Sequence, residues 1–238
     1  MMMKKISLIT LFIPVLFTGC ENKCIEDAGR PVSRTLAVKS FDRIKVEGAI
    51  QLVMVQDSSY KIQIAADSNI IAYVKADVSG DELKLKLDDD KYCGTDSIMI
   101  RAGIGELRAL KLDGAVKAAG EGRIYADDLE LSFSGAADVQ LDLSARKVVT
   151  RVDGVGKILF SGQAGVHDLK INGTARVEAF DFIVGVYNID TDGTGKANIN
   201  VLNELKVKTS GSSEIYYKGN PKKVDEKKSG ATKLEKVN

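Results

Sequence analysis

The chain has 238 residues, of which 28% are charged and 6% aromatic, and it contains no tryptophan and only 3 prolines. Its formal net charge is +1, so no basic field marks it as a nucleic-acid-binding protein. This length allows one or two domains, because all-β solenoids, sandwiches and barrels of this size often form a single unit.

The first residues are typical of an export signal. Lys4 and Lys5 precede an apolar run over 6–17, which is too short to span a bilayer, since a transmembrane helix needs about 20 apolar residues. Phe17-Thr18-Gly19-Cys20 resembles the bacterial lipobox, whose cysteine is diacylated, although leucine is usual where Phe17 stands. We therefore expect a lipoprotein signal peptide over 1–19 and lipidation of Cys20, with a plain secretory signal as the alternative.

Lipidation would determine where the protein resides. Acyl chains contribute about 0.8 kcal/mol per buried methylene, so two or more chains hold a protein stably on a membrane. We expect a lipidated tether over 20–38 and a place in the cell envelope, at the outer membrane, on its periplasmic or surface face. Without Lys4 and Lys5 the mature chain has 32 basic and 33 acidic residues.

Two cysteines remain for other roles. Cys24 and Cys93 would lie in an oxidising compartment, where they can form a disulfide or stay as two unpaired thiols. No CxxC pair or Cys/His cluster occurs, so structural zinc is not expected. The acidic loop 88–90 could hold calcium, but three adjacent acids more often form a solvated turn. No metal site and no cofactor is predicted.

Residues 39–103 alternate apolar and polar side chains in irregularly spaced runs, as in 60–65 and 82–87, which predicts strands. A stretch around 68–75 is the best helical candidate. Gly48 lies between two short strands, as the later turn glycines do. We interpret this part as a β cap that closes one end of a repeat structure, because open ends would expose unpaired strand edges.

Residues 104–218 contain a repeat of about 19–20 residues. Each copy has Asp, Ser or Asn, then glycine, then a small or β-branched residue. An apolar residue lies four positions after the glycine, an apolar or β-branched residue two before it, and an apolar residue four before it. Thr150 is the one departure at the fourth position. With Gly48, the turn glycines are Gly114, Gly135, Gly154, Gly173, Gly193 and Gly211.

A repeat of constant length places like residues above like residues, so each strand pairs in parallel with its counterpart one coil on and the apolar columns form a continuous core. The sequence therefore predicts an all-β fold, a parallel β-helix or solenoid. Asp, Ser or Asn before glycine suits a turn, because the short side chain can bond the next amides and glycine accepts a positive φ. A catalytic or metal-binding ladder of Asp113, Asp153 and Asp192 is the alternative. Residues 219–238 are rich in lysine and predict a disordered tail.

Several segments together resemble the head GIN domain family of auto-transporter adhesins, common among lipoproteins of Bacteroides-like bacteria. They are the lipobox, residues 41–48, residues 62–71 and the Ser/Asp-Gly turns. The resemblance spans about 39–218 and implies a right-handed β-helix and an adhesin, and it brings no catalytic residues.

Catalytic residues are not evident. His167, the one histidine, is expected at the surface, and no nucleophile motif accompanies it. Asp138, Asp142 and Glu178 are the carboxylates that a polysaccharide lyase or hydrolase on this fold could use, but they are scattered in the repeat. Tyr187, Tyr216 and Tyr217 are candidate carbohydrate platforms, although Tyr217 falls on an inward column.

The leading hypothesis is a non-enzymatic envelope lipoprotein whose β faces serve adhesion, scaffolding or recognition of an unidentified protein or glycan, held on the membrane by its lipid. The alternative is a polysaccharide-processing enzyme, which would require a cleft where carboxylates of neighbouring coils converge.

Overall fold

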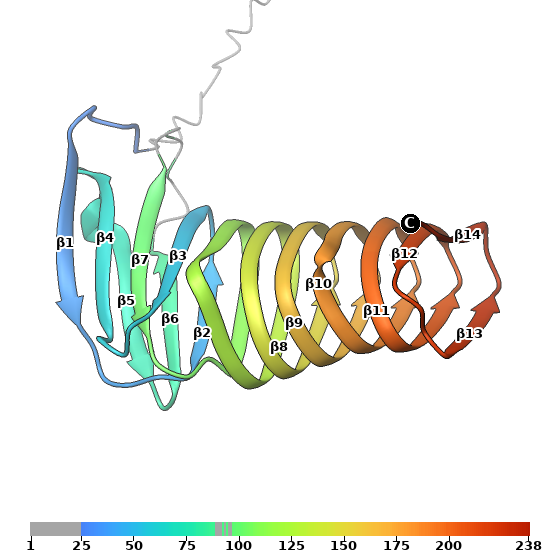
Figure 1. Ribbon diagram of the computed structural model, residues 1–238. Helices are drawn as coiled ribbons and strands as arrows, with labels where there is room; N and C mark the ends of the chain where they lie inside the picture. The colour runs from blue at the N-terminus through green and yellow to red at the C-terminus, as the bar shows by residue number, and fades with distance from the viewer. Residues whose placement is uncertain (1–24, 89–91, 93, 95–96) are drawn as a thin grey trace, which may run out of the picture.

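The computed structural model describes residues 25–88, 92, 94 and 97–238, which form a parallel β-solenoid with a β cap at its N-terminal end (Figure 1). The cap contains β1 (Pro31–Ala37), β2 (Arg43–Glu47), β3 (Ile50–Gln56), β4 (Lys61–Asp67), the 3-10 helix η1 (Ile71–Tyr73), β5 (Val74–Ser79), β6 (Glu82–Leu87) and β7 (Ile98–Ile104). The coils contain β8 (Ala109–Val152), β9 (Val155–Ile171), β10 (Thr174–Thr191), β11 (Thr194–Thr209), β12 (Ser212–Lys218), β13 (Lys223–Lys228) and β14 (Thr232–Lys236).

Successive coils pair in parallel at equivalent positions of the repeat. Asp138 lies opposite Lys157, Lys157 opposite Arg176, and Arg176 opposite Lys196. This register confirms the predicted solenoid, because a constant repeat length sets each residue above its counterpart.

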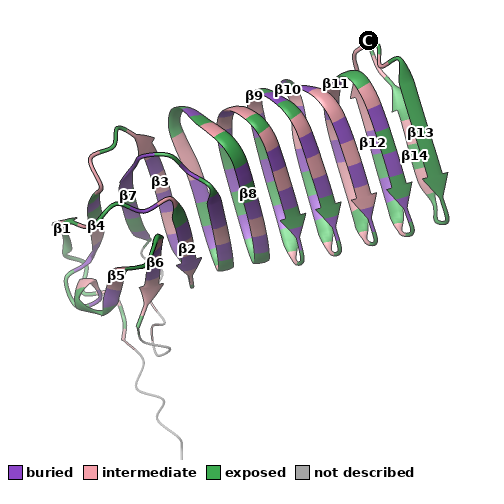
Figure 2. Cartoon of the chain, turned by 90° about the horizontal axis from the view of Figure 1, so that it is seen from below, coloured by how far each residue is buried: buried purple, intermediate pink, exposed green. Residues whose placement is uncertain are grey.

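The side chains inside the coils form stacked apolar columns. The positions two and four before each turn glycine and four after it are buried throughout the regular coils, as the alternating colours along the strands show (Figure 2). Thr150, the polar exception, is also fully buried. Burial of one apolar side chain stabilises the fold by about 1.5–3 kcal/mol, so these columns supply the main driving force for folding.

The turn glycines stack directly on one another, and this stacking explains why they are glycines. Only Gly48, Gly114 and Gly135 have the positive φ that we expected for the whole set. At Gly154, Gly173, Gly193 and Gly211, a Cβ atom would lie 1.9–2.1 Å from the carbonyl oxygen of the glycine one coil earlier. The steric demand at these four turns therefore comes from the neighbouring coil.

Polar side chains beside this glycine column bond between coils. Asn172 Nδ2 donates to Asp153 Oδ1 at 2.5 Å, and Ser210 Oγ donates to Asp192 Oδ1 at 2.6 Å. We expected bonds to the following amides, and at these two turns the bonds run to the neighbouring coil instead. The Asp/Ser/Asn column thus links coils along the solenoid axis.

Residues 219–238 differ from the predicted disordered tail. β13 pairs in parallel with β11 and β14 pairs with β12, and a Cβ at Gly230 would lie 2.0 Å from Gly211 O, so this segment continues the glycine column. The lysine-rich composition gave a wrong prediction here because the inward positions hold charged residues. Earlier coils have apolar residues or threonine at these positions, whereas this coil has Glu226 and Lys228, which form an ion pair at 2.5 Å. Charges of this kind oppose further strand pairing at an exposed edge.

The cap provides the first layer on which the coils stack. β2 pairs with both β6 and β8, β3 pairs with both β7 and β8, and Gly48 begins the glycine column. β1 and β4 extend the sheet of β7 in antiparallel pairs, and β5 extends that of β6. The helical segment expected around 68–75 is reduced to the three residues of η1.

His167 is buried, which corrects its predicted surface position. It lies six residues before Gly173, and in parallel register it stacks between Val148 and Tyr187 on a third inward column. Thr150 Oγ1 lies 2.9 Å from His167 Nε2, so these two buried polar side chains form a pair. Burial lowers the pKa of His167 to about 3, although the negative charge of the neighbouring Asp168 acts to raise it.

The glycine column predicts a sharp difference between two Gly→Ala variants. Gly173→Ala forces a Cβ against the Gly154 backbone and should lower the unfolding free energy by about 1–3 kcal/mol. Gly156→Ala is the control, because its register partners Ala137 and Ala175 are alanines and its nearest obstacle is the Val152 side chain at 3.1 Å. Urea denaturation of both variants measures the effect, and equal losses would contradict the column.

The buried histidine predicts an acid-sensitive stability. The unfolded state takes up the imidazole proton near pH 6.5, whereas the folded state resists until about pH 3, so stability falls as the pH drops through this window. Between pH 7 and 4.5, the wild type should lose about 2–3 kcal/mol more than a Thr150→Val/His167→Leu variant, which leaves no unpaired partner. The free energy of unfolding is measured by chemical denaturation at each pH. If it fell equally with pH in the wild type and in the variant, this account of His167 would be refuted.

Candidate functional site

A long groove follows the strand that leaves each turn glycine. We call it the first groove. It has a volume of about 710 Å³ and crosses β8 to β12. Its floor consists of the residues directly after the glycines, which are small or β-branched: Ala115, Ala136, Val155, Thr174, Thr194 and Ser212. Because these residues are short, the strand surface is hollowed along the solenoid axis, and Val155 is 61% exposed.

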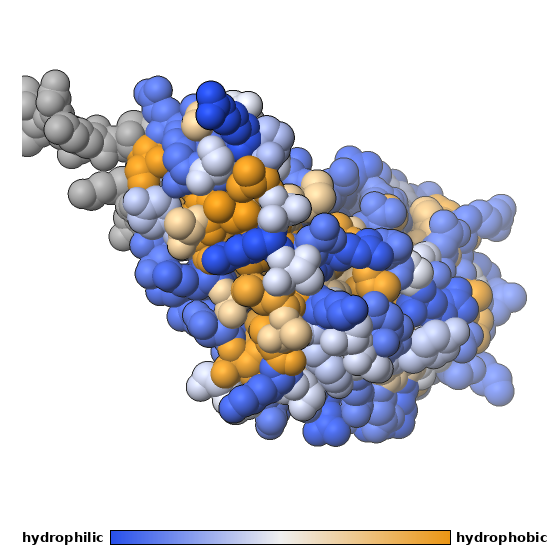
Figure 3. Space-filling view, turned by 90° about the vertical axis from the view of Figure 1, so that its left-hand side faces the viewer, coloured by the Kyte–Doolittle hydropathy of each residue, from blue (hydrophilic) through white to orange (hydrophobic). Residues whose placement is uncertain are grey.

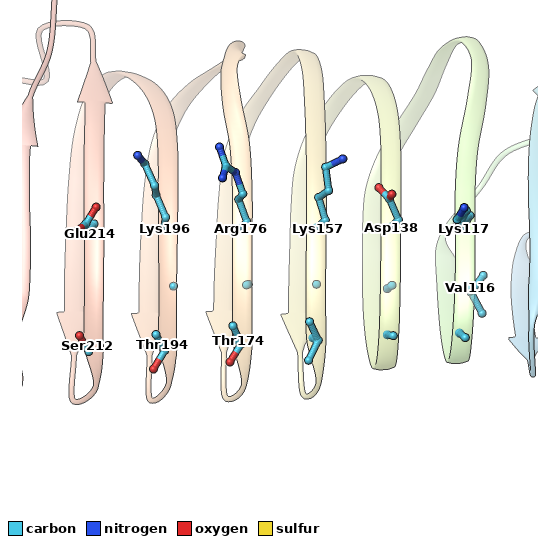
Figure 4. Close-up of a pocket in the computed structure, with 17 residues that line it drawn as sticks. Val116, Lys117, Asp138, Lys157, Thr174, Arg176, Thr194, Lys196, Ser212 and Glu214 are labelled. Atoms are coloured by element: carbon cyan, nitrogen blue, oxygen red, sulfur yellow. The ribbon is translucent and has the colours of Figure 1, made fainter.

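A row of charged side chains forms one wall of the first groove, one per coil (Figure 4). The row contains Lys117, Asp138, Lys157, Arg176, Lys196 and Glu214. Coils in a β-sheet are about 4.8 Å apart, so the row offers an extended ligand charged contacts at regular intervals beside an apolar floor.

Three of these wall residues are held by neighbours, and one of them, Glu214, accepts a hydrogen bond from the Tyr216 hydroxyl at 3.3 Å. Arg176 Nε lies 2.8 Å from Glu178 Oε1, and Lys196 Nζ lies 4.9 Å from the centre of the Tyr216 ring. Burial acts to raise the pKa of Glu178, but hydrogen bonds from Asn198 and Arg176 outweigh it, so the pKa is lowered and the group stays ionised. The wall is therefore preorganised for binding, and Glu178 is not poised as an acid.

A second groove of about 810 Å³ runs along the strands that enter the turns. Its lining is more strongly charged, and many of its charges are held in ion pairs. Asp168 accepts bonds from Lys147 at 2.7 Å and Asn188 at 2.6 Å, and Lys208 lies 3.4 Å from Asp190. Burial acts to raise the pKa of Asp168, and these partners lower it overall. This groove has fewer free charges to offer a ligand.

The carboxylates that an enzyme could use do not converge. Asp142 pairs with Arg123 at 2.8 Å, Glu178 pairs with Arg176, and Asp138 lies on the wall of the first groove. A glycosidase needs one carboxyl whose pKa is raised. Within the described residues, each carboxyl whose pKa shifts is shifted downward.

The aromatic candidates have different environments. Tyr187 is fully buried, so its candidacy as a platform is wrong, and Tyr217 packs half-buried against the core. Tyr216 lies between Lys196 and Lys233 on the outside of the coils. We missed Tyr125, which is 62% exposed, although it follows the buried Ile124 and strand alternation places it outward.

Some predicted features cannot be located. Cys20, Cys24 and Cys93 lie outside the described residues, as do 89 and 90 of the acidic loop, so lipidation, the disulfide and calcium binding stay untested. Within the part of the chain that the structure covers, no three His, Cys, Asp or Glu side chains gather as a metal site would require. Within the same residues, no helix has the length and apolarity to cross a membrane.

Comparison with solved structures shows the same fold in several bacterial proteins. A putative adhesin from Bacteroides fragilis superposes with a TM-score of 0.82 at 22% identity, covering 90% of this chain and 100% of that one. A putative adhesin from Parabacteroides distasonis has a TM-score of 0.68 at 22% identity, with 90% and 99% covered. A protein from the same species, described as a putative lipid binding protein, has a TM-score of 0.68 at 18% identity, with 91% and 100% covered.

The sequence itself places the chain in a family. No curated protein matches it. Residues 40–221 match the family described as "Putative auto-transporter adhesin, head GIN domain". This range begins just before β2 and ends just after β12, so it includes most of the cap and the coils up to β12. The chain therefore belongs to the head GIN domain family.

Proposed function

We propose that this protein is a non-enzymatic adhesin of the cell envelope that binds an extended segment of a protein or glycan along the first groove. Membership of the head GIN family and the likeness to adhesin-type structures support the adhesion role. The observation that carries the proposal is the groove itself. Its apolar floor and its periodic wall of charges extend over several coils, and its carboxylates lack the converging geometry of a hydrolase.

The first groove is the better candidate of the two because its surface is available to a ligand. Its floor is small and largely free of charge, so a bound chain can approach the strands closely, and Lys117, Asp138 and Lys157 project beside that floor. In the second groove, a ligand would compete with ion pairs such as Lys147 with Asp168. Displacing such pairs costs part of the binding energy.

We also propose that Cys20 is lipidated and holds the protein at the outer membrane. The lipobox-like residues 17–20 support this anchor, and an adhesin needs attachment to the cell that uses it. Coils that stack into a rigid rod would then present the groove at a fixed distance from the anchored end.

Filling the first groove should weaken adhesion strongly. The double variant Thr174→Tyr/Thr194→Tyr places two rings on the exposed floor. Its affinity for immobilised glycans and matrix proteins should fall at least about tenfold, which corresponds to about 1.4 kcal/mol of binding free energy. Lys170→Tyr/Lys208→Tyr in the second groove is the matched control and should bind as the wild type does. Adhesion assays with cells bearing each variant measure this. Release of reducing sugar from polysaccharides by the purified protein would favour the enzyme instead.

Loss of the anchor should release the protein. The Cys20→Ala variant cannot accept acyl chains, so it should move from the membrane to the soluble fraction when cells are fractionated. Cys24→Ala, four residues further on, is the control and should stay with the membrane. Undiminished membrane retention of Cys20→Ala would overturn the lipid anchor.

A further inference from the structure

The cap is open at the end that faces away from the coils. β1 is the edge strand of one cap sheet and β5 is the edge strand of the other. Arg34 of β1 donates a hydrogen bond from Nη2 to the Val74 carbonyl of β5, so these two edges lie opposite each other. Within the described residues, neither strand has a further partner on its outer side.

Apolar side chains gather at this open end. Strand alternation places Val32 and Leu36 on the same face of β1 as Arg34, and Ala76 and Val78 on the same face of β5 as Val74. Val32 is 41% exposed, and the other three of these apolar residues are half-buried and pack against the edge of the core. Figure 3 shows hydrophobic side chains across this end of the molecule. A clustered apolar face of this kind is typical of an interaction surface.

The position of the tether indicates what covers this face. Residues 26–30 are fixed to the loop before η1, where Asn69 donates to the Glu26 carbonyl and the Arg30 amide donates to Asp67 Oδ2 at 3.1 Å. Only four residues separate Cys20 from Ile25, so the two can lie at most about 17 Å apart. Lipids on Cys20 would therefore enter the membrane close to the cap.

We propose that the open end of the cap rests on the lipid bilayer and that the coils project away from it. This inference depends on the proposed lipid anchor. Val32, with the half-buried Leu36 beside it, would meet the interface between headgroups and acyl chains. Tyr73, which is 39% exposed, has the amphipathic ring that is favoured there. β1 contains no acidic residue that would oppose anionic headgroups.

Tryptophan fluorescence can test this orientation, because the chain has no tryptophan of its own. The lipidated full-length protein, carrying either Tyr73→Trp at the cap or Tyr216→Trp on the distal coils, is reconstituted in vesicles of phosphatidylcholine with brominated acyl chains. Trp at 73 should lose about half of its emission relative to unbrominated vesicles, since an interfacial ring lies within about 5–10 Å of the acyl boundary. Trp at 216 should keep its emission.

A pair of charge variants tests the face itself. Val32→Asp in the Tyr73→Trp protein should remove most of the quenching, whereas Ser33→Asp, on the opposite face of β1, should leave it unchanged. Thermal unfolding of both variants checks that the cap remains folded. Equal quenching with Val32→Asp and Ser33→Asp would overturn the proposed contact.

The remaining outcomes separate this inference from the anchor. Protein that floats with vesicles but shows no quenching at 73 keeps the anchor and overturns the docked cap. Equal quenching at 73 and 216 would mean that the solenoid lies flat on the membrane. A stable dimer that protects position 73 would assign the face to a second copy. Protein that fails to float overturns the anchor and this inference with it.

Discussion

The fold depends on close contact between the backbones of successive coils at the turn glycines. A carbonyl oxygen of one turn occupies the space where the next turn would place a Cβ atom, and the amide that follows the glycine bonds that oxygen, as Thr174 N does to Gly154 O at 2.8 Å. This contact sets the axial spacing and the register at once. The apolar columns then follow, because a constant register places each inward side chain above its counterpart.

The same repeat explains what sequence could and could not reveal. The spacing of the glycines predicted the parallel coils and their inward columns, since periodicity is a property of the sequence itself. It did not predict the burial of His167, because we traced the inward positions only to the fourth residue before each glycine and His167 occupies the sixth. The terminal coil was missed for a different reason: Ser229-Gly230 keeps the spacing, but Glu226 and Lys228 replace the inward apolar residues.

The candidate site was harder to predict than the fold. The groove is formed by residues directly after the glycines, which look unremarkable one at a time, and it exists only because several coils align them. Single residues chosen for their chemistry had other roles: Tyr187 fills the core, and Glu178 is held by Arg176 and Asn198. Aligned surfaces of this kind suit recognition of extended partners, and a cap near the anchor would direct them away from the membrane.

The stacking of coils is tested most directly by a distance between two spin labels. Asp138 and Lys233 occupy the same outward position five coils apart. Cysteines placed there, with Cys20, Cys24 and Cys93 replaced by serine, should give a narrow distance distribution centred near 24 Å. Moving the first label from Asp138 to Lys157 should shorten that distance by about 4.8 Å. A broad distribution, or a distance that does not shorten by one strand spacing, would contradict the solenoid and its terminal coil.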